Sequence, residues 1–264
     1  MLTRSVGPVT VVALPDAEGL FFQPRAEAFP TATAAHWRLA DERDPEAVTA
    51  DGQWRLPFRC FALRVDDGPA AGRVILVDAG IGPADAPARH WAPVPGRLPA
   101  TLAAVGIAPE QVDTVVLTHL HTDHIGWAVT GAAGTPYFGN ARYLLQRADI
   151  EAVRRNDPSG VAGYLLDPLT AAGQLDALDG DLRLGTGIRI VATPGHTPGT
   201  SRSWSNMPTR ACCSPATCWC TRCNWSPPSC RTCTRTTRSP PAPPGSGCSP
   251  NWPPGRPPRS APRT

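Results

Sequence analysis

The segment 119–124, HLHTDH, gathers four side chains that can bind a metal ion: His119, His121, Asp123 and His124. The apolar, β-branched run 112–118 precedes them, so we expect them to leave the end of a buried strand together. Neutral imidazoles and carboxylates are the ligands that Zn²⁺ prefers, and a catalytic zinc keeps one position open for water. The sequence therefore predicts a metal centre here rather than a solvated loop.

A second motif, PGHTPG at 194–199, places His196 in a loop that follows another apolar run. Glycine and proline punctuate this loop and allow a close approach of its backbone. Taken alone, the pattern is equally typical of a turn with an incidental histidine. Downstream of the first cluster, it indicates a third histidine ligand. His36 and His90 stand alone in the sequence and are predicted to be ordinary surface or core residues.

The motifs THLHTDHIGW and TPGHTPG resemble those of the metallo-β-lactamase-fold hydrolases. The segments ILVDAGIG and NARYLLQRADIEAV are also similar to that family, so the resemblance covers most of residues 10–200. It implies an α/β fold, a four-layer αββα sandwich with a pair of metal ions at one edge of its sheets. It also assigns the site residues: His119, His121 and His196 to one metal, Asp123 and His124 to the other, and Asp78 to a supporting place beside the ligands.

The chemistry follows from such a metal pair. Two divalent ions that share a water lower its pKa towards neutrality and stabilise the oxyanion that forms. We expect a metal-bound hydroxide to attack a carbonyl or phosphoryl centre, with Asp123 as the candidate catalytic residue that orients it. No serine or cysteine nucleophile is required.

The branch of the family that the motifs resemble narrows the range of expected substrates and metal ions. HTDHIGW, with Trp127, is more similar to lactonases and organophosphate hydrolases than to the antibiotic-destroying enzymes. We therefore expect hydrolysis of a small ester, lactone, thioester or organophosphate. The expected cofactor is a pair of divalent metal ions, with Zn²⁺ as the first candidate. His121 stands where the diiron flavoprotein relatives carry a carboxylate, which disfavours oxygen reduction. A mononuclear non-haem iron sulfur dioxygenase of the same fold remains an alternative.

The elements that position these residues are predicted from apolar runs bounded by turn residues. Strands are expected at 8–14, 58–65, 73–80, 112–119, 141–146 and 188–195. Helices are expected at 98–107 and 147–156, which have helical spacing and strong helix formers. Because hairpin-like pairs alternate with helices, a mixed sheet is favoured over an all-parallel one.

The composition changes abruptly at about residue 200. Residues 1–200 hold all 22 acidic residues and 16 arginines, a formal charge of −6, whereas residues 201–264 hold nine arginines and no acid, a charge of +9. The second segment has no Leu, Ile, Val, Phe, Tyr or His, but eight of the nine cysteines. Without branched aliphatic residues it cannot complete a core. We therefore expect one domain over 1–200 and a foreign, disordered tail over 201–264.

Three interpretations of the tail are open. The CxC and CxxC spacings of Cys218, Cys220 and Cys223 suit a zinc module, but the flanking sequence lacks the apolar residues of a folded spacer. The arginines and tryptophans suit a nucleic-acid-binding module. The third interpretation, a reading-frame shift in GC-rich DNA, yields Arg, Pro and Cys without any selected partner, and we favour it.

A shift of one base restores what the tail lacks. In the shifted frame, each codon consists of the third base of one residue's codon and the first two bases of the next. If third codon positions hold G or C, the codons of Cys218–Thr221 then encode Leu-Val-His, and those of Cys223–Ser226 encode Gln-Leu-Val. The family's two remaining ligands, an Asp after a Gly and a final His, are absent from 201–264. The shifted codons permit Gly-Asp across Pro215–Thr217 and His at Arg263–Thr264.

If the frame is shifted, the chain as written is expected to fold poorly, to bind at most one metal ion well and to have little activity.

The remaining expectations concern location and partners. The sequence has no apolar run of about 18 residues and no signal-peptide pattern at its start, so we expect a cytoplasmic protein that does not enter a membrane. Its expected partner is a small-molecule substrate, and its oligomeric state is left open.

Overall fold

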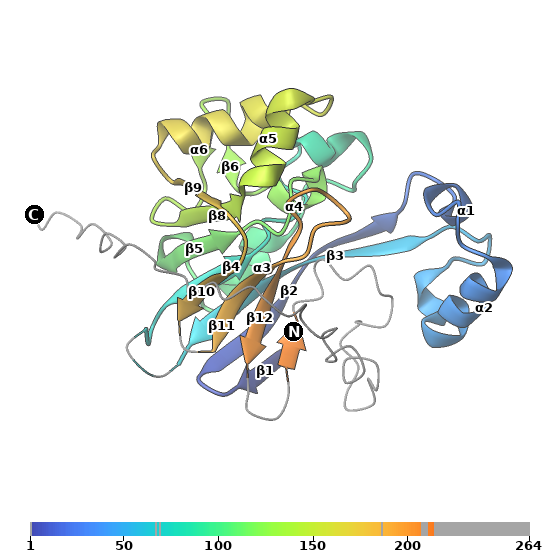
Figure 1. The fold of residues 1–264 in the computed structure, drawn as a ribbon, viewed down its shortest axis with the longest axis horizontal. Helices are drawn as coiled ribbons and strands as arrows, with labels where there is room; N and C mark the ends of the chain where they lie inside the picture. Colours follow the sequence, from blue (N-terminus) through green and yellow to red (C-terminus); the bar gives the residue numbers. More distant parts are fainter. Residues whose placement is uncertain (1, 67, 69, 186, 207–210, 214–264) are drawn as a thin grey trace, which may run out of the picture.

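The main sheet of the molecule is mixed, as the sequence predicts. The computed structural model describes residues 2–66, 68, 70–185, 187–206 and 211–213. The main sheet has seven strands in spatial order: β1 (Thr3–Val6), β2 (Val9–Leu20), β3 (Arg55–Val65), β4 (Val74–Val77), β5 (Val112–Val116), β8 (Arg142–Gln146) and β9 (Leu175–Leu178). Neighbours from β1 to β4 are antiparallel, and neighbours from β4 to β9 are parallel (Figure 1).

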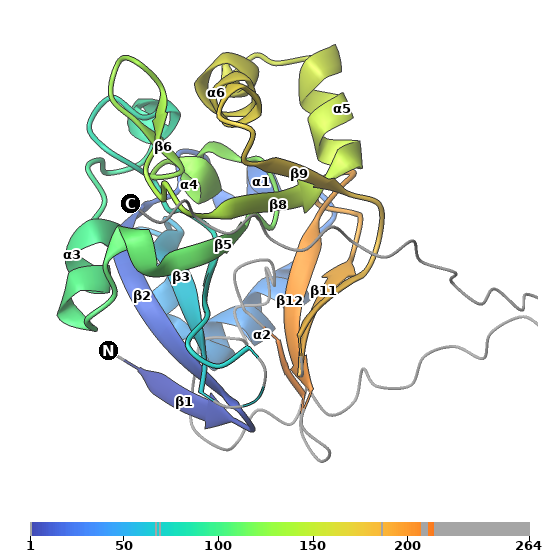
Figure 2. The same ribbon diagram turned by 90° about the vertical axis from the view of Figure 1, so that its left-hand side faces the viewer.

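A second sheet of antiparallel strands packs on one face of the main sheet (Figure 2). Its strands are β10 (Leu182–Gly185), β11 (Ile188–Ala192), β12 (Ser201–Asn206) and β13 (Ala211–Cys213). Ile188 and Ile190 of β11 join the core between the two sheets. β12 thus extends beyond the predicted domain boundary at residue 200, while most of the predicted tail lies outside the described residues.

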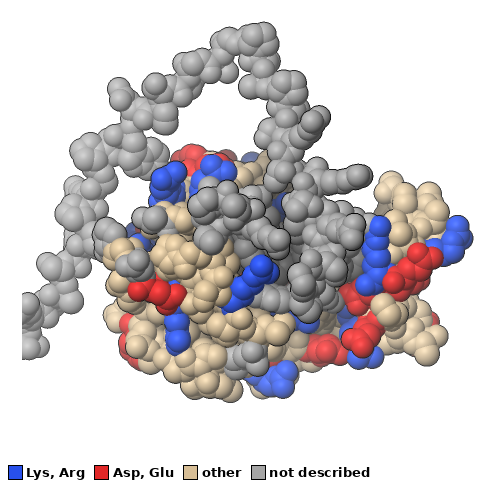
Figure 3. All heavy atoms as spheres, turned by 90° about the horizontal axis from the view of Figure 1, so that it is seen from below, with Lys and Arg blue, Asp and Glu red and all other residues tan. Residues whose placement is uncertain are grey.

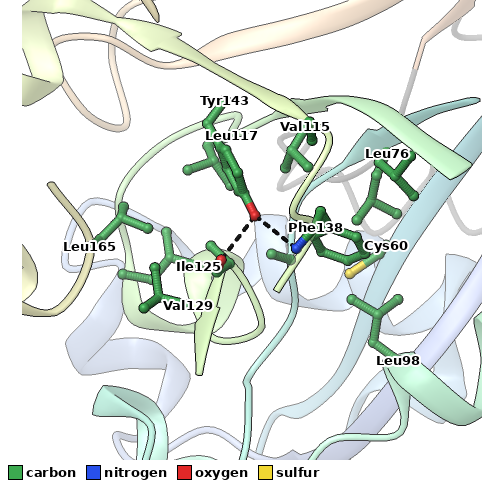
Figure 4. Close-up of a cluster of buried hydrophobic side chains, with 14 of the residues drawn as sticks. Cys60, Leu76, Leu98, Val115, Leu117, Ile125, Val129, Phe138, Tyr143 and Leu165 are labelled. Atoms are coloured by element: carbon green, nitrogen blue, oxygen red, sulfur yellow. Dashed lines mark hydrogen bonds between the residues drawn. The ribbon is translucent and has the colours of Figure 1, made fainter. Parts of the chain in front are cut away.

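Helices cover the other face of the main sheet. They are α3 (Leu98–Ala104), α4 (Thr122–Ile125), α5 (Arg147–Arg155), the π-helical segment Ala162–Leu166 and α6 (Asp167–Ala171). Figure 4 shows part of the core beneath them, with Leu165 on the side of Ile125 and Val129 and Leu98 on the side of Cys60. Short 3-10 turns at Pro45–Ala47, Pro87–His90 and Pro109–Gln111 and a small hairpin, β6 (Val129–Thr130) and β7 (Thr135–Pro136), complete the connections.

The four apolar residues of β4 show why this sequence forms a central strand. Val74 and Leu76 belong to the core under the helices, whereas Ile75 and Val77 belong to the core between the sheets. A strand covered on both faces is continuously apolar instead of alternating. Helices, main sheet and second sheet are three consecutive layers of the predicted αββα sandwich, and the predicted fold class is confirmed.

An arm built from residues 21–54 projects from the body (Figure 1). It carries α1 (Arg25–Ala28) and α2 (Ala34–Arg43) between the long paired strands β2 and β3. Thr33 and His36 cap α2: Thr33 Oγ1 accepts from the His36 amide, and His36 Nδ1 accepts from the Thr33 amide. No residue of α2 is buried, and His36 and His90 are both exposed, away from the histidine cluster.

Charged side chains of both signs are mixed on one face of the molecule. Figure 3 shows arginine and acidic side chains interspersed over the arm and the body of the face in view. On the arm, the guanidinium of Arg25 pairs with Asp41. In the part of the chain that the structure describes, none of the helices has the length and apolar character needed to cross a membrane.

Candidate metal centre

Two adjacent parallel strands deliver the first residues of the site to one edge of the main sheet. β4 and β5 pair in parallel, with Val77 opposite Val116, so their carboxyl ends emerge side by side. In α/β sheets, this edge is where ligands bind. Asp78 follows β4, and His119 lies three residues after β5 ends. The backbone of Asp78 has φ of 62°, a left-handed conformation that Asp adopts more readily than most residues.

Asp78 forms a buried network behind the histidines and is only 1% exposed. Its Oδ1 accepts hydrogen bonds from the amide and the hydroxyl of Thr118, each at 2.8 Å. Its Oδ2 lies 2.8 Å from Nδ1 of His124. Asp78 therefore tethers the end of β5 and orients the His124 ring.

The structure brings His119, His121 and His196 together, although 75 residues separate the last two. One nitrogen of each ring lies within 4.8 Å of the corresponding nitrogens of the other two. Nδ1 of His121 is 3.1 Å from Nε2 of His119 and 3.0 Å from Nε2 of His196. His119 is buried, whereas His121 and His196 are exposed, so the cluster opens to solvent on one side.

A tight loop between β11 and β12 presents His196. The Thr193 amide donates to the carbonyl of Thr200 at 2.7 Å and closes the loop. Within it, the Thr197 amide donates to the Thr200 hydroxyl at 2.8 Å. The PGHTPG motif thus forms the exposed turn that the sequence indicates, and its histidine points at the β5 cluster.

Asp123 and His124 lie beside this triad. The ring centroids of His119 and His124 are 4.0 Å apart, and Nε2 of His124 is 3.3 Å from Oδ2 of Asp123. Burial acts to lower the pKa of His124, but the carboxylates of Asp123 and Asp78 hold it well above the usual range. Burial acts to raise the pKa of Asp123, and its contacts with His124 more than offset that effect and lower it.

The pKa values of the three clustered histidines are shifted in the opposite direction from that of His124. Loss of hydration at the ring nitrogens, with the neighbouring imidazoles, lowers the pKa of His119 far below its usual range and that of His196 to about 4. The same loss of hydration lowers the pKa of His121, although the outer sides of the His121 and His196 rings are exposed. All three rings are therefore neutral near pH 7, and a neutral imidazole is the form that binds a metal.

The donor set fits one divalent ion. Zinc–nitrogen bonds of about 2.0–2.1 Å in a tetrahedral site place neighbouring nitrogens roughly 3.3 Å apart. The separations of 3.1 and 3.0 Å around His121 come close to this value, and the third pair, His119 and His196, lies within 4.8 Å. The exposed side of the cluster leaves room for the fourth position that a catalytic site keeps open. For a second ion, the described residues offer Asp123 as a candidate ligand, and His124 once its ring has lost its proton.

Backbone contacts fix the turn after the cluster against the loop after Asp78. The Gly126 amide donates to the Gly80 carbonyl, and the Trp127 amide donates to the Ala79 carbonyl, both at 2.7 Å. A Cβ on Gly126 would lie 2.2 Å from the carbonyl carbon of Ile81. Only glycine permits this approach, which explains the glycine of HIGW.

Two buried carboxylates near the site were missed by the sequence analysis. Asp16 of β2 accepts hydrogen bonds from the amides of Ile81 and Leu98, each at 2.7 Å, and so joins the loop after Asp78 to α3. The position of Asp16 within an otherwise apolar strand is a sequence signal that could have revealed this residue. Asp149, in the first turn of α5, gave no such signal because acidic residues are common there.

Comparison with known proteins identifies the family. The model of the metallo-beta-lactamase superfamily matches residues 57–209, more than half of the chain. The chain therefore belongs to the metallo-beta-lactamase superfamily. An N-acyl homoserine lactonase of Bacillus cereus is 27% identical over 165 residues, 58% of this chain and 59% of that protein. A hydroxyacylglutathione hydrolase of Acidiphilium cryptum is 37% identical over 107 residues, 40% of this chain and 35% of that protein.

A solved structure supports the fold. AidC, a dizinc quorum-quenching lactonase in complex with the product N-hexnoyl-L-homoserine, matches 80% of this chain and 72% of its own with a TM-score of 0.62 and 16% identity. The family that the motifs indicate is confirmed, and the chain is similar to lactonases of that family. The chain spans about three fifths of the length of the Bacillus cereus lactonase that it matches. The roles of individual site residues remain predictions.

Proposed function

We propose that this protein is a metal-dependent hydrolase that opens a lactone ring in a small molecule with an apolar substituent. The observation that carries the proposal is the convergence of His119, His121 and His196, three neutral imidazoles whose nitrogens lie within 4.8 Å. The similarity to N-acyl homoserine lactonases supports the lactone as substrate.

Each side chain of the site has a role in this proposal. The three histidines would hold the ion, and Asp78 would hold His124 beside it. Asp123, whose pKa is lowered, would accept a hydrogen bond from the attacking water and orient it. A divalent ion bound here would act as a Lewis acid towards the lactone carbonyl and lower the pKa of a water.

An aromatic cluster next to the ligands supports the apolar part of the substrate. Nε1 of Trp91 donates a 3.0 Å hydrogen bond to the hydroxyl of Thr122, which lies between His121 and Asp123 in the sequence. The rings of Phe22 and Phe58 lie 5.7 and 5.6 Å from that of Trp91, and Phe22 is 61% exposed. Such a surface suits an acyl chain better than a charged group.

The chain as written is proposed to be impaired. Residues 201–264 contain no Asp and no His, so the two further ligands of a complete metal pair are absent from them. Turnover with one ion is expected to be slow.

Lactone opening releases one proton per turnover at neutral pH and is followed with a pH indicator. We expect slow, chelator-sensitive opening of an N-acyl homoserine lactone, with no activity in the His121→Ala variant. A phosphotriester and a hydroxyacylglutathione thioester serve as competing substrates. Faster turnover of either one, or equal rates with and without chelator, would overturn the proposal. Metal analysis of the same preparation tests the dioxygenase alternative, for which a single iron is expected.

A further inference from the structure

We infer that Asp149 is a positioning residue that fixes His196 at the metal site. The inference rests on the proposed function, because it concerns a ligand of that same site. His119 and His121 follow one strand and are supported by the network around Asp78. His196 comes from the other sheet, so its position depends on what holds the loop 193–200.

Asp149 reaches this loop from the helix layer. It lies in the first turn of α5, which follows β8 of the main sheet, and it is only 3% exposed. Figure 2 shows α5 beginning near the loop that leads into β12. Both carboxylate oxygens of Asp149 are used: Oδ1 accepts from the Gly199 amide at 2.7 Å, and Oδ2 accepts from the Thr197 hydroxyl at 3.0 Å.

The packing around these bonds leaves little freedom. A Cβ on Gly199 would lie 2.7 Å from the carboxyl carbon of Asp149, so the glycine lets the loop close onto the helix. The Thr197 hydroxyl is also 2.7 Å from that of Thr200. Thr197, next to His196 in the chain, is thereby held both by α5 and by Thr200, the residue before β12.

A buried carboxylate keeps such a place only when its bonds compensate for its lost hydration. Burial raises the pKa of Asp149, and the bonds from Gly199 and Thr197 act against that shift. Groups that orient metal ligands commonly change metal affinity by about 10–100-fold when they are removed. The geometry therefore assigns Asp149 to the alignment of His196 and gives it no contact with the ion.

The test uses the full chain and Zn²⁺ alone, with affinity measured by competition with a chromophoric chelator. Asp149→Ala is expected to lower Zn²⁺ affinity by about 10–100-fold. Asp149→Asn keeps an acceptor for the Gly199 amide and a polar partner for the Thr197 hydroxyl, so it is expected to retain most of the affinity. The matched control is Asp157→Ala, because Asp157 also accepts two bonds, from the Val161 and Ala162 amides at 2.7 Å each. Asp157→Ala is expected to leave Zn²⁺ affinity unchanged.

A double-mutant cycle separates positioning from general loss of structure. In the His196→Ala background, Asp149→Ala is expected to cause no further loss of Zn²⁺ affinity. An equal loss in both backgrounds, or an equal loss in Asp157→Ala, would overturn the inference. If the variants show the expected Zn²⁺ affinities but the unsubstituted chain opens no lactone, the proposed function is wrong and the positioning role of Asp149 is still supported.

If Asp149→Ala fails to fold, the visible spectrum of the Co²⁺-loaded Asp149→Asn and Thr197→Val variants gives a second readout. Thr197→Val removes the hydroxyl bond and keeps the shape of the side chain. A changed Co²⁺ band in Thr197→Val and an unchanged band in Asp149→Asn are expected. Identical bands in the unsubstituted chain and Thr197→Val would count against the inference.

Discussion

The amide of Ser201 donates a 2.8 Å hydrogen bond to the carbonyl oxygen of Thr118. Both residues are buried and lie at the ends of strands of different sheets: Thr118 follows β5 and Ser201 begins β12. This bond joins the edges from which His119 and His196 emerge. The two motifs of the sequence therefore meet where the two sheets are joined.

The histidine triad is expected to bind one Zn²⁺ per chain. Replacing His119, His121 or His196 with alanine removes a ligand, and the affinity should fall by more than about 100-fold, since even outer groups account for 10–100-fold. Metal content after dialysis measures the effect. His36→Ala is the control, because His36 caps α2 on the arm. Unchanged zinc content in any of the triad variants would contradict the assignment.

The reading-frame hypothesis makes its own prediction about metal content. The chain as written should hold at most one tightly bound ion, whereas a chain with the frame restored after about residue 200 should hold two, because an Asp and a His become available. Sequencing the genomic DNA from codon 190 onward tests the frame directly. Two tightly held ions in the chain as written would show that the prediction is wrong.

Gly126→Ala should destabilise the fold by about 3 kcal/mol or more, since the added Cβ would lie 2.2 Å from the carbonyl carbon of Ile81 and backbone must move. Gly139→Ala is the matched control, as nothing lies within 4 Å of a Cβ there. Urea unfolding of both variants gives the comparison. Equal unfolding free energies of the two variants would mean that the loop after Asp78 moves to accommodate the added Cβ without destabilising the fold.

Tyr143→Phe should cost about 1–3 kcal/mol at pH 7, because the Ala128 carbonyl and the Phe138 amide lose their partner (Figure 4). Burial raises the pKa of Tyr143, whereas an unfolded tyrosine ionises at about pH 10. The contribution of the Tyr143 hydroxyl to the unfolding free energy is therefore fully present below pH 10 and declines as the pH rises further. The difference in unfolding free energy between the unsubstituted chain and Tyr143→Phe should narrow between pH 7 and pH 10.5. A constant difference would argue against a buried neutral phenol.

The elements that the sequence predicts are those with a strong apolar pattern. The run Val74–Val77 is continuously apolar because both faces of this strand are covered, and in Val112–Val116 three valines surround Asp113 and Thr114. Helix α2 escaped prediction because it buries no residue and so carries no apolar face to detect. The arm that contains it is defined instead by the long pairing of β2 with β3.

By itself, the sequence determined which side chains gather after β5. Four metal-capable side chains within 119–124 directly after an apolar strand specify local chemistry, since neighbours in the chain stay neighbours in the fold. The PGHTPG motif also predicted His196 as a third ligand, but the tertiary structure decided how that loop meets the cluster. The loop of His196 is held beside the cluster by Asp149 and by contacts between two sheets and a helix layer, and such contacts depend on how the layers pack. No pattern in the spacing of residues encodes a bond such as that from Gly199 to Asp149, because the two residues lie 50 positions apart.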